Sequence, residues 1–171
     1  MNRKLTIKHL ASATAFCTLL ILAVGSTDDS ETGSSSSKVP PTYNQGDSFQ
    51  VGYTSYNVIR SVWSLKLSDN QFMDDKPDAM FLFVELVVRN NDKKARSIPP
   101  FALVDENGAE YETSSKGWAL DDVISSLDSL NPGVKKQGIV IFDVPQNHTY
   151  KLKLSGGYWS SKNAYVNLNP K

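Results

Sequence analysis

Apolar side chains recur at every second position through much of residues 46–171, and this alternation restricts the fold more than any other feature. In residues 80–88 alternate positions place apolar side chains on one face of an extended strand: Met80, Leu82, Val84, Leu86 and Val88. The opposite face is also largely apolar, with Phe81, Phe83, Glu85 and Val87. Because a strand that is apolar on both faces is buried on both faces, residues 80–88 are predicted to be the central strand of a sheet.

Short runs of β-branched and aromatic residues lie on both sides of this strand: residues 49–51, 56–63, 102–105, 109–113, 138–144, 150–154 and 164–168. Asn107-Gly108 predicts a tight hairpin, because both residues tolerate a positive φ. Asn131-Pro132-Gly133 predicts a second turn, in which Pro sets φ and Gly takes the left-handed position. Seven to eight short strands separated by turns predict an antiparallel sandwich, and no βαβ alternation suggests a parallel sheet.

The only helical pattern is in residues 119–127, where Asp121 and Asp122 would occupy the first turn of a helix. Carboxylates favour that position because they complement the positive end of the helix dipole. The sequence therefore predicts an all-β domain over residues 46–171 with one short helical connection.

Residues 1–25 have the three parts of a secretory signal: a basic start, an apolar stretch and small residues at the end. We predict cleavage between Gly25 and Ser26. The alternative is an uncleaved N-terminal anchor, although about 16 apolar residues give only ~24 Å of helix against ~30 Å of hydrocarbon. In either case the chain is expected to be extracytoplasmic, either secreted or held at the cell surface.

Residues 26–45 are rich in Ser, Asp and Thr and have almost nothing to bury, which predicts a disordered tether. The leader resembles that of a bacterial lipoprotein, but Ser26 stands where the acylated cysteine would be. Cys17 does not replace it, because Phe16 precedes it and an apolar run follows it. The segment is therefore lipoprotein-like without a cysteine to acylate.

Composition excludes several classes of function. The chain has 171 residues with 18 Lys and Arg against 18 Asp and Glu, so no net field gathers a nucleic acid. The single cysteine and His9 lie in the leader, which leaves the folded part with no thiol and one imidazole, His148. Disulfides, Cys/His zinc sites and cysteine nucleophiles are therefore not expected, and no cofactor is predicted.

Four stretches, in order, resemble a known family: GDSF at 46–49, FVELVVRNN at 83–91, the hairpin at 101–111, and LNPG at 130–133 followed by GIVIFDVP at 138–145. The family consists of bacterial exported domains of unknown function, related to the mycobacterial immunoprotective secreted antigen. The resemblance covers nearly all of residues 46–168. It implies an immunoglobulin-like β-sandwich and transfers no catalytic residue.

Candidate chemistry is sparse. The loop of residues 69–78 carries Asp69, Asp74, Asp75 and Asp78, but its spacing is not that of an EF-hand, so a solvated loop is the preferred interpretation and calcium binding the alternative. His148 follows Val144-Pro145 in a predicted turn, and no Gly-x-Ser-x-Gly elbow supplies a serine for it. Two of the carboxylates of Asp121, Asp122 and Asp128 could form a glycosidase pair, but the sequence alone does not place any two of them at the separation that glycoside hydrolysis requires. No catalytic, cofactor or metal residue is predicted.

Three aromatic side chains in predicted loops are the best candidates for an interaction surface: Trp118, Tyr158 and Trp159. The alternative is that they cover the open ends of the sandwich. We predict a non-catalytic exported or cell-surface module that contacts a protein or envelope partner, with membrane contact only through an uncleaved N-terminal segment. The alternatives are a cell-surface inhibitory or exclusion protein, and an envelope hydrolase that uses the acidic loops.

Overall fold

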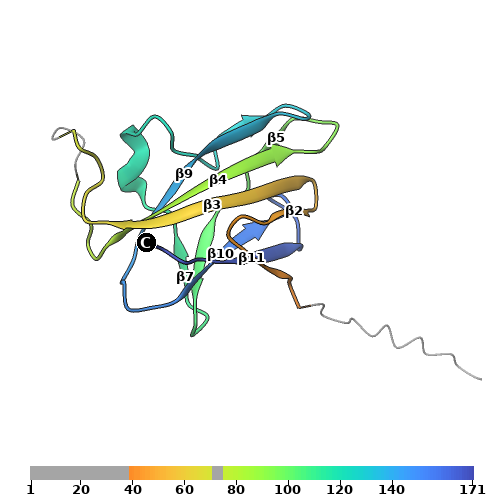
Figure 1. Cartoon of the computed structure of the whole chain (residues 1–171). Coiled ribbons are helices and arrows are strands. Elements are labelled where there is room, and N and C mark those ends of the chain that lie inside the picture. The colour runs from red at the N-terminus through yellow and green to blue at the C-terminus, as the bar shows by residue number, and fades with distance from the viewer. Residues whose placement is uncertain (1–38, 71–74) are drawn as a thin grey trace, which may run out of the picture. The chain divides into compact units, whose positions relative to one another are not determined.

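The computed structural model describes residues 39–70 and 75–171 (Figure 1). The predicted leader, the Gly25–Ser26 junction and the spacer up to residue 38 lie outside the described residues. Among the residues described, no helix has the length and hydropathy needed to cross a membrane.

The described chain is built from strands, with a single 3₁₀ helix, η1, at Ser115–Ala119. The strands are β1 Thr42–Asn44, β2 Ser48–Val51, β3 Thr54–Ser64, β4 Phe81–Asn90, β5 Arg96–Ser97, β6 Ala102–Asp105, β7 Glu110–Glu112, β8 Ser129–Leu130, β9 Lys135–Asp143, β10 Tyr150–Ser155 and β11 Asn163–Asn167. All the runs predicted from alternation form strands, and β1, β5 and β8 are additional.

Two sheets face each other, as the two layers of Figure 1 show. One sheet has the order β2-β3-β4-β9 and the other β1-β11-β10-β6-β7, while β5 and β8 form a small separate pair. Apart from β1 with β11, the neighbouring strands pair antiparallel. The predicted all-β, antiparallel sandwich is therefore confirmed.

Strand β4 is central, with β3 on one side and β9 on the other. Its inward face contributes Leu82, Val84, Leu86 and Val88, all fully buried in the core between the sheets. Its outward face contributes Phe81 to a second, smaller cluster with Leu67 and Ile141. The two apolar faces predicted for this strand thus pack into two separate clusters. Leu120 and Val123, from the segment that follows η1, pack against the second one.

Both predicted turns form as expected. Gly108 has a φ of 86° between β6 and β7, and Gly133 has a φ of 75° before β9. In the first turn the carboxylate of Asp105 accepts hydrogen bonds from the amides of Asn107 and Ala109, both at 2.9 Å. The side chain therefore satisfies backbone donors that the tight turn leaves without strand partners.

The predicted helix over residues 119–127 is wrong. The helical turn is 3₁₀ and lies earlier, at Ser115–Ala119, so Asp121 and Asp122 are exposed turn residues and do not begin a helix. The amide of Ile139 donates to the carbonyl of Asp122, and the amide of Ile124 donates to the carbonyl of Ile139, both at 2.8 Å. Because these backbone groups are hydrogen-bonded to β9, the segment lies against the sheet, and the same groups cannot form the i to i−4 hydrogen bonds of a helix.

The predicted tether ends too late in the sequence. Thr42–Asn44, which fall within its predicted bounds, form β1 and pair in parallel with Tyr165–Asn167 of β11. Tyr43 provides the physical reason, since its ring stacks on Phe49 with centroids 3.9 Å apart. A three-residue edge strand of this kind is defined by its partner, so local alternation does not reveal it.

Candidate functional site

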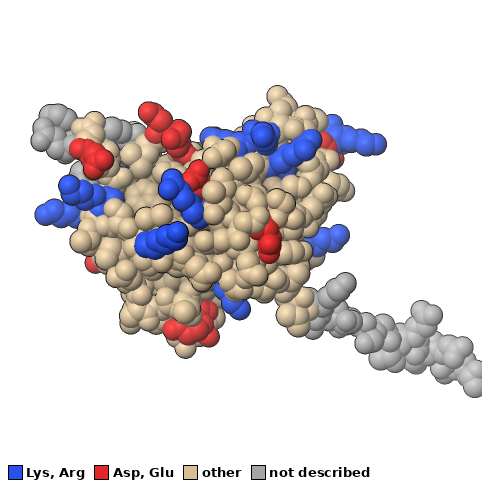
Figure 2. Space-filling view, viewed as in Figure 1, with Lys and Arg blue, Asp and Glu red and all other residues tan. Residues whose placement is uncertain are grey.

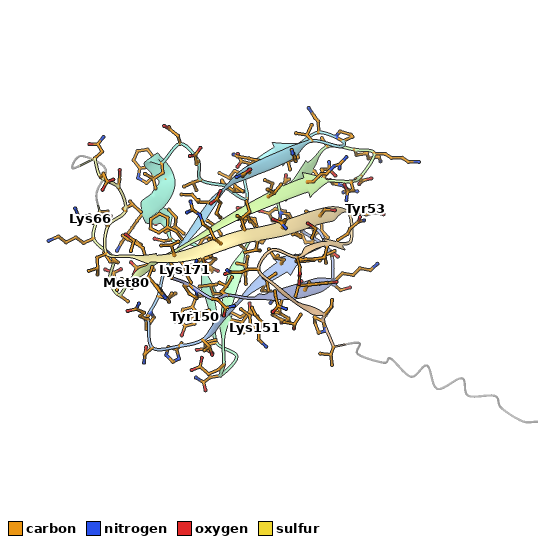
Figure 3. All side chains as sticks on the ribbon, in the orientation of Figure 1. Tyr53, Lys66, Met80, Tyr150, Lys151 and Lys171 are labelled. Carbon is orange, nitrogen blue, oxygen red and sulfur yellow. The ribbon has the colours of Figure 1, made fainter. Side chains whose placement is uncertain are left out.

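The three predicted interaction residues are all exposed, but they do not form one surface. Trp118 is 85% exposed, Tyr158 53% and Trp159 100%. Trp118 lies in η1 beside the end of β9 that pairs with the start of β4, whereas Tyr158 and Trp159 follow β10 at the opposite end of the sandwich. Figure 3 shows these two ends by their labels, with Met80 at one and Tyr53 at the other.

A close backbone approach positions the loop that carries Tyr158 and Trp159. A Cβ atom on Gly156 would lie 3.0 Å from Cα of Gly52, and one on Gly52 would lie 2.8 Å from the carbonyl oxygen of Gly156. Gly52 also has a φ of 57°, which disfavours other residues. The turn between β2 and β3 therefore packs directly against the loop between β10 and β11.

Buried and local hydrogen bonds fix this arrangement. The hydroxyl of Tyr56 donates to the carbonyl of Ser155 at 2.6 Å, and burial raises the pKa of Tyr56, so the hydroxyl stays protonated. Within the loop, the amide of Gly156 donates to the carbonyl of Lys162 at 3.0 Å, and the amide of Ser160 donates to the carbonyl of Gly157 at 3.1 Å. The loop is thus an ordered turn that projects its aromatic side chains.

Tyr53, in the β2–β3 turn, joins the two loop aromatics. It is 56% exposed, and its carbonyl accepts a hydrogen bond from the amide of Asn91 at 2.8 Å. The guanidinium of Arg96 lies 5.4 Å from the centre of the Tyr53 ring, a cation–π distance. Arg96 also pairs with Asp92, and their hydrogen bond is the main cause that lowers the pKa of the Asp92 carboxyl.

These groups surround a cavity of about 700 Å³ at the end of the sandwich. We call this site the aromatic end and define it by Tyr53, Arg96, Tyr158, Trp159, Ser160 and Lys162, all of which line the cavity. Among the described residues, no carboxylate lines it. Exposed Tyr, Trp and Arg around a concavity match the composition of a binding hot spot, and the ammonium group of Lys162 suits an anionic group of a ligand.

Sequence reasoning missed Tyr53 and Arg96 as members of this site. Both lie far from Tyr158 in the sequence. Tyr53 comes from the β2–β3 turn and Arg96 from β5 of the small separate pair, so only tertiary packing brings them to the β10–β11 loop. The glycines at positions 52 and 156 were the available signal, since a glycine at a turn often marks a close backbone approach.

The acidic loop proposed for calcium is only partly described, because residues 71–74, Asp74 among them, lie outside the described residues. Asp78 forms an ion pair with Lys116 at 3.1 Å, and Lys116 also contacts Asp143 at 2.9 Å. Partial burial raises the pKa of Asp143, but the amides of Asp78 and Ala79 together with Lys116 outweigh it, so the net pKa is lowered. In residues 39–70 and 75–171 no group of three potential metal ligands is found.

His148 lies in a turn, as predicted, and contacts the β6–β7 turn. Its Nδ1 lies 2.8 Å from Oε1 of Glu106, while the amide of Thr149 donates to Oε2 of Glu106 at 2.9 Å. The His148 hydrogen bond is the main cause that lowers the pKa of Glu106 to about 2. These contacts connect the loop of His148 with the β6–β7 turn. None of them places a hydroxyl nucleophile against the imidazole.

The carboxylates considered for hydrolysis do not converge. Asp128 is held by Lys136 at 2.7 Å and by the amide of Ser125 at 2.9 Å. Asp121 and Asp122 are exposed turn residues.

The family model for a domain of unknown function, DUF4352, matches residues 43–164. The chain belongs to the DUF4352 family. The match spans the sandwich from β1 to the start of β11, including both loops of the aromatic end. No curated protein matches the DUF4352 chain in sequence.

Solved structures similar to this DUF4352 chain share its fold at low sequence identity. The yjhA protein from Bacillus subtilis is 18% identical, covers 74% of this chain and 99% of its own, and has a TM-score of 0.58. The secreted protein MPT63 from Mycobacterium tuberculosis is 15% identical over 78% of this chain and 100% of its own, with a TM-score of 0.55. A putative lipoprotein, ycdA, from Bacillus subtilis is 14% identical over 72% of this chain and 39% of its own, with a TM-score of 0.53.

The Asn-Asn pair that ends β4 in this DUF4352 domain has a structural role. The buried amide of Asn90 donates to the carbonyls of Lys94 and Leu130, both at 2.8 Å. Its side-chain oxygen accepts from the amide of Asp92 at 2.9 Å. Asn90 therefore fastens the loop between β4 and β5, which borders the aromatic end.

Proposed function

We propose that this chain is a non-catalytic, exported or cell-surface binding module and that the aromatic end is its contact surface. The observation that carries the proposal is the exposure of Tyr53, Tyr158 and Trp159 around one concavity. Two tyrosines and a tryptophan half to fully exposed at one place present apolar area that a partner would cover. Ordered loops hold these rings, so binding costs little conformational entropy.

The extracytoplasmic location is part of the proposal. The leader-like composition of residues 1–25 supports it, as do the printed descriptions of two similar structures, one a secreted protein and one a putative lipoprotein. A non-catalytic role is supported by the lining of the aromatic end, since among the described residues it offers no histidine, cysteine or carboxylate that could act as a base for its serine hydroxyls.

The test measures retention of the full chain on sedimented envelope fragments. The double variant Tyr158→Ala, Trp159→Ala is expected to weaken retention about 30-fold or more, because hot-spot truncations cost ~2 kcal/mol or more. Trp118→Ala is the control, since it removes another largely exposed tryptophan, from the opposite end. It is expected to leave retention unchanged.

Both variants are expected to keep the melting temperature of the unmodified chain, because the truncated rings are half to fully exposed. Equal weakening by Trp118→Ala and by the double variant, or no weakening by either, would contradict the proposal.

A further inference from the structure

Although the total charge of the chain is zero, the cations are unevenly distributed. Several exposed cations lie at the same end of the sandwich as the aromatic end: Arg89, Lys93, Lys94, Lys135 and Lys162. Within the part of the chain that the structure describes, none of these five has a carboxylate within 4 Å. Figure 2 shows several Lys and Arg side chains along the upper right of the molecule, with others at the left and centre of this face.

The acidic side chains near this end are already neutralised. Asp92 pairs with Arg96, and Asp128 pairs with Lys136. The remaining exposed cations have no carboxylate within ion-pair distance among the described residues, and they lie near a site whose described lining holds no carboxylate. A surface of this kind attracts anions at long range.

Two of the cations are placed at a cost to stability. Arg89 on β4 lies directly opposite Lys135 on β9, so like charges face each other across the ladder. Such a pair is destabilising relative to an opposite-charge pair. The pair adds positive surface potential to this part of the sandwich, and an anionic partner would offset the repulsion.

The start of β1 also lies at this end. Strand β1 runs parallel to β11, with Thr42 opposite Tyr165 and Asn44 opposite Asn167. Asn163, at the start of β11, directly follows the loop that carries Trp159, and the amide of Tyr165 donates to the carbonyl of Pro41 at 2.9 Å. Pro41 and the start of β1 therefore lie on the side of the domain that carries the aromatic end.

We propose that the aromatic end docks on a membrane surface that carries anionic lipid. Trp159 and Tyr158 would lie at the level of the headgroups, where amphipathic aromatic rings are favoured. Lys93, Lys94 and Lys162 would lie against the lipid phosphates, where each cation adds to the attraction. This inference rests on the proposed function and identifies the partner of the same site.

The geometry favours a lipid surface over an acidic peptide. The cations come from separate segments around the rings, namely the β4–β5 loop and the β10–β11 loop, as a broad charged surface requires.

The test uses the full chain, vesicles of brominated phosphatidylcholine with phosphatidylglycerol, and quenching of tryptophan fluorescence. Trp118→Phe leaves Trp159 as the exposed reporter, and Trp159→Phe leaves Trp118; Trp63 is common to both. We expect strong quenching in Trp118→Phe and little in Trp159→Phe. Because the comparison is between two ends of one domain, any contribution of the N-terminal segment is the same in both variants.

Charge dependence is tested in the same vesicles. The double variant Lys93→Gln, Lys94→Gln is expected to lower the docking constant about 25-fold, because each lysine near an anionic surface contributes roughly a factor of five. Vesicles of brominated phosphatidylcholine alone are expected to give little quenching of Trp159. Equal quenching of the two reporters, or quenching that ignores both phosphatidylglycerol and the lysines, would overturn the inference.

The failures of the two proposals can be told apart. If vesicles do not quench Trp159 but retention on envelope fragments still depends on Tyr158 and Trp159, the lipid inference is overturned and the binding function stands. The same conclusion follows if retention persists on fragments from which detergent has removed the lipid, since the partner is then a protein or polymer. If neither assay depends on these residues, both proposals are overturned.

Discussion

Replacing Asn90 by alanine tests how the loop beside the aromatic end is held. The side chain is 3% exposed and makes three hydrogen bonds, two donated to the carbonyls of Lys94 and Leu130 and one accepted from the amide of Asp92. Each intramolecular hydrogen bond contributes roughly 1 kcal/mol net, and a buried carbonyl left unpaired costs a further ~1–3 kcal/mol. Asn90→Ala is therefore expected to lower the free energy of unfolding by about 4 kcal/mol.

The assay is equilibrium unfolding in urea, and the neighbouring residue supplies the control. Asn91 is exposed, and its amide contacts the side chains of Gln50 and Ser55, so water replaces those contacts at little cost. Asn91→Ala is expected to change the free energy of unfolding by less than about 1 kcal/mol. A loss below 1 kcal/mol for Asn90→Ala, or equal losses for the two variants, would refute the reasoning.

Three further predictions follow from single contacts. Gly156→Ala is expected to lower the free energy of unfolding by ~1–3 kcal/mol, because its Cβ would lie 3.0 Å from the backbone of Gly52; an unchanged urea midpoint would be evidence against that close approach. Glu106 has a pKa lowered to about 2, mainly by His148, so its contribution to stability is complete above the ordinary pKa of 4.5 and is lost as pH falls through 2. Acid unfolding should therefore be less steep over that interval in Glu106→Gln, and identical profiles would contradict this. Lys135→Glu replaces a like-charge pair across β4 and β9 by an opposite-charge pair and is expected to raise stability by roughly 0.5 kcal/mol while weakening vesicle docking; a loss of stability would contradict it.

The strands, and which of them is central, could be predicted because alternation and turn residues are local features of the sequence. Alternation in residues 80–88 identifies the central strand, and the positive φ of Gly108 and Gly133 follows from turn chemistry. The helix prediction failed for a tertiary reason, since β9 binds the backbone of Asp122 and Ile124 and a helix would leave those bonds unmade. Strand β1 was missed because its parallel partner is the last strand of the domain.

The candidate site was only half predictable. The exposure of Trp118, Tyr158 and Trp159 agrees with loop positions read from the sequence, but their division between two ends depends on the connection of η1 to β9. The basic surroundings of the aromatic end were hidden by the balanced total charge, because a sum over the chain loses where the charges lie. The register of the strands reveals local charge that the net charge of the chain does not, because it places Arg89 directly opposite Lys135.

The central claim is that the protein acts by contact through the aromatic end. Site-specific photocrosslinking tests it most directly, with a photoreactive amino acid placed at position 159 or at position 118 of the full chain in intact cells. We predict adducts with envelope components from position 159 and few from position 118, although both side chains are exposed. Adducts of equal yield from the two positions, or adducts from position 118 alone, would contradict the account.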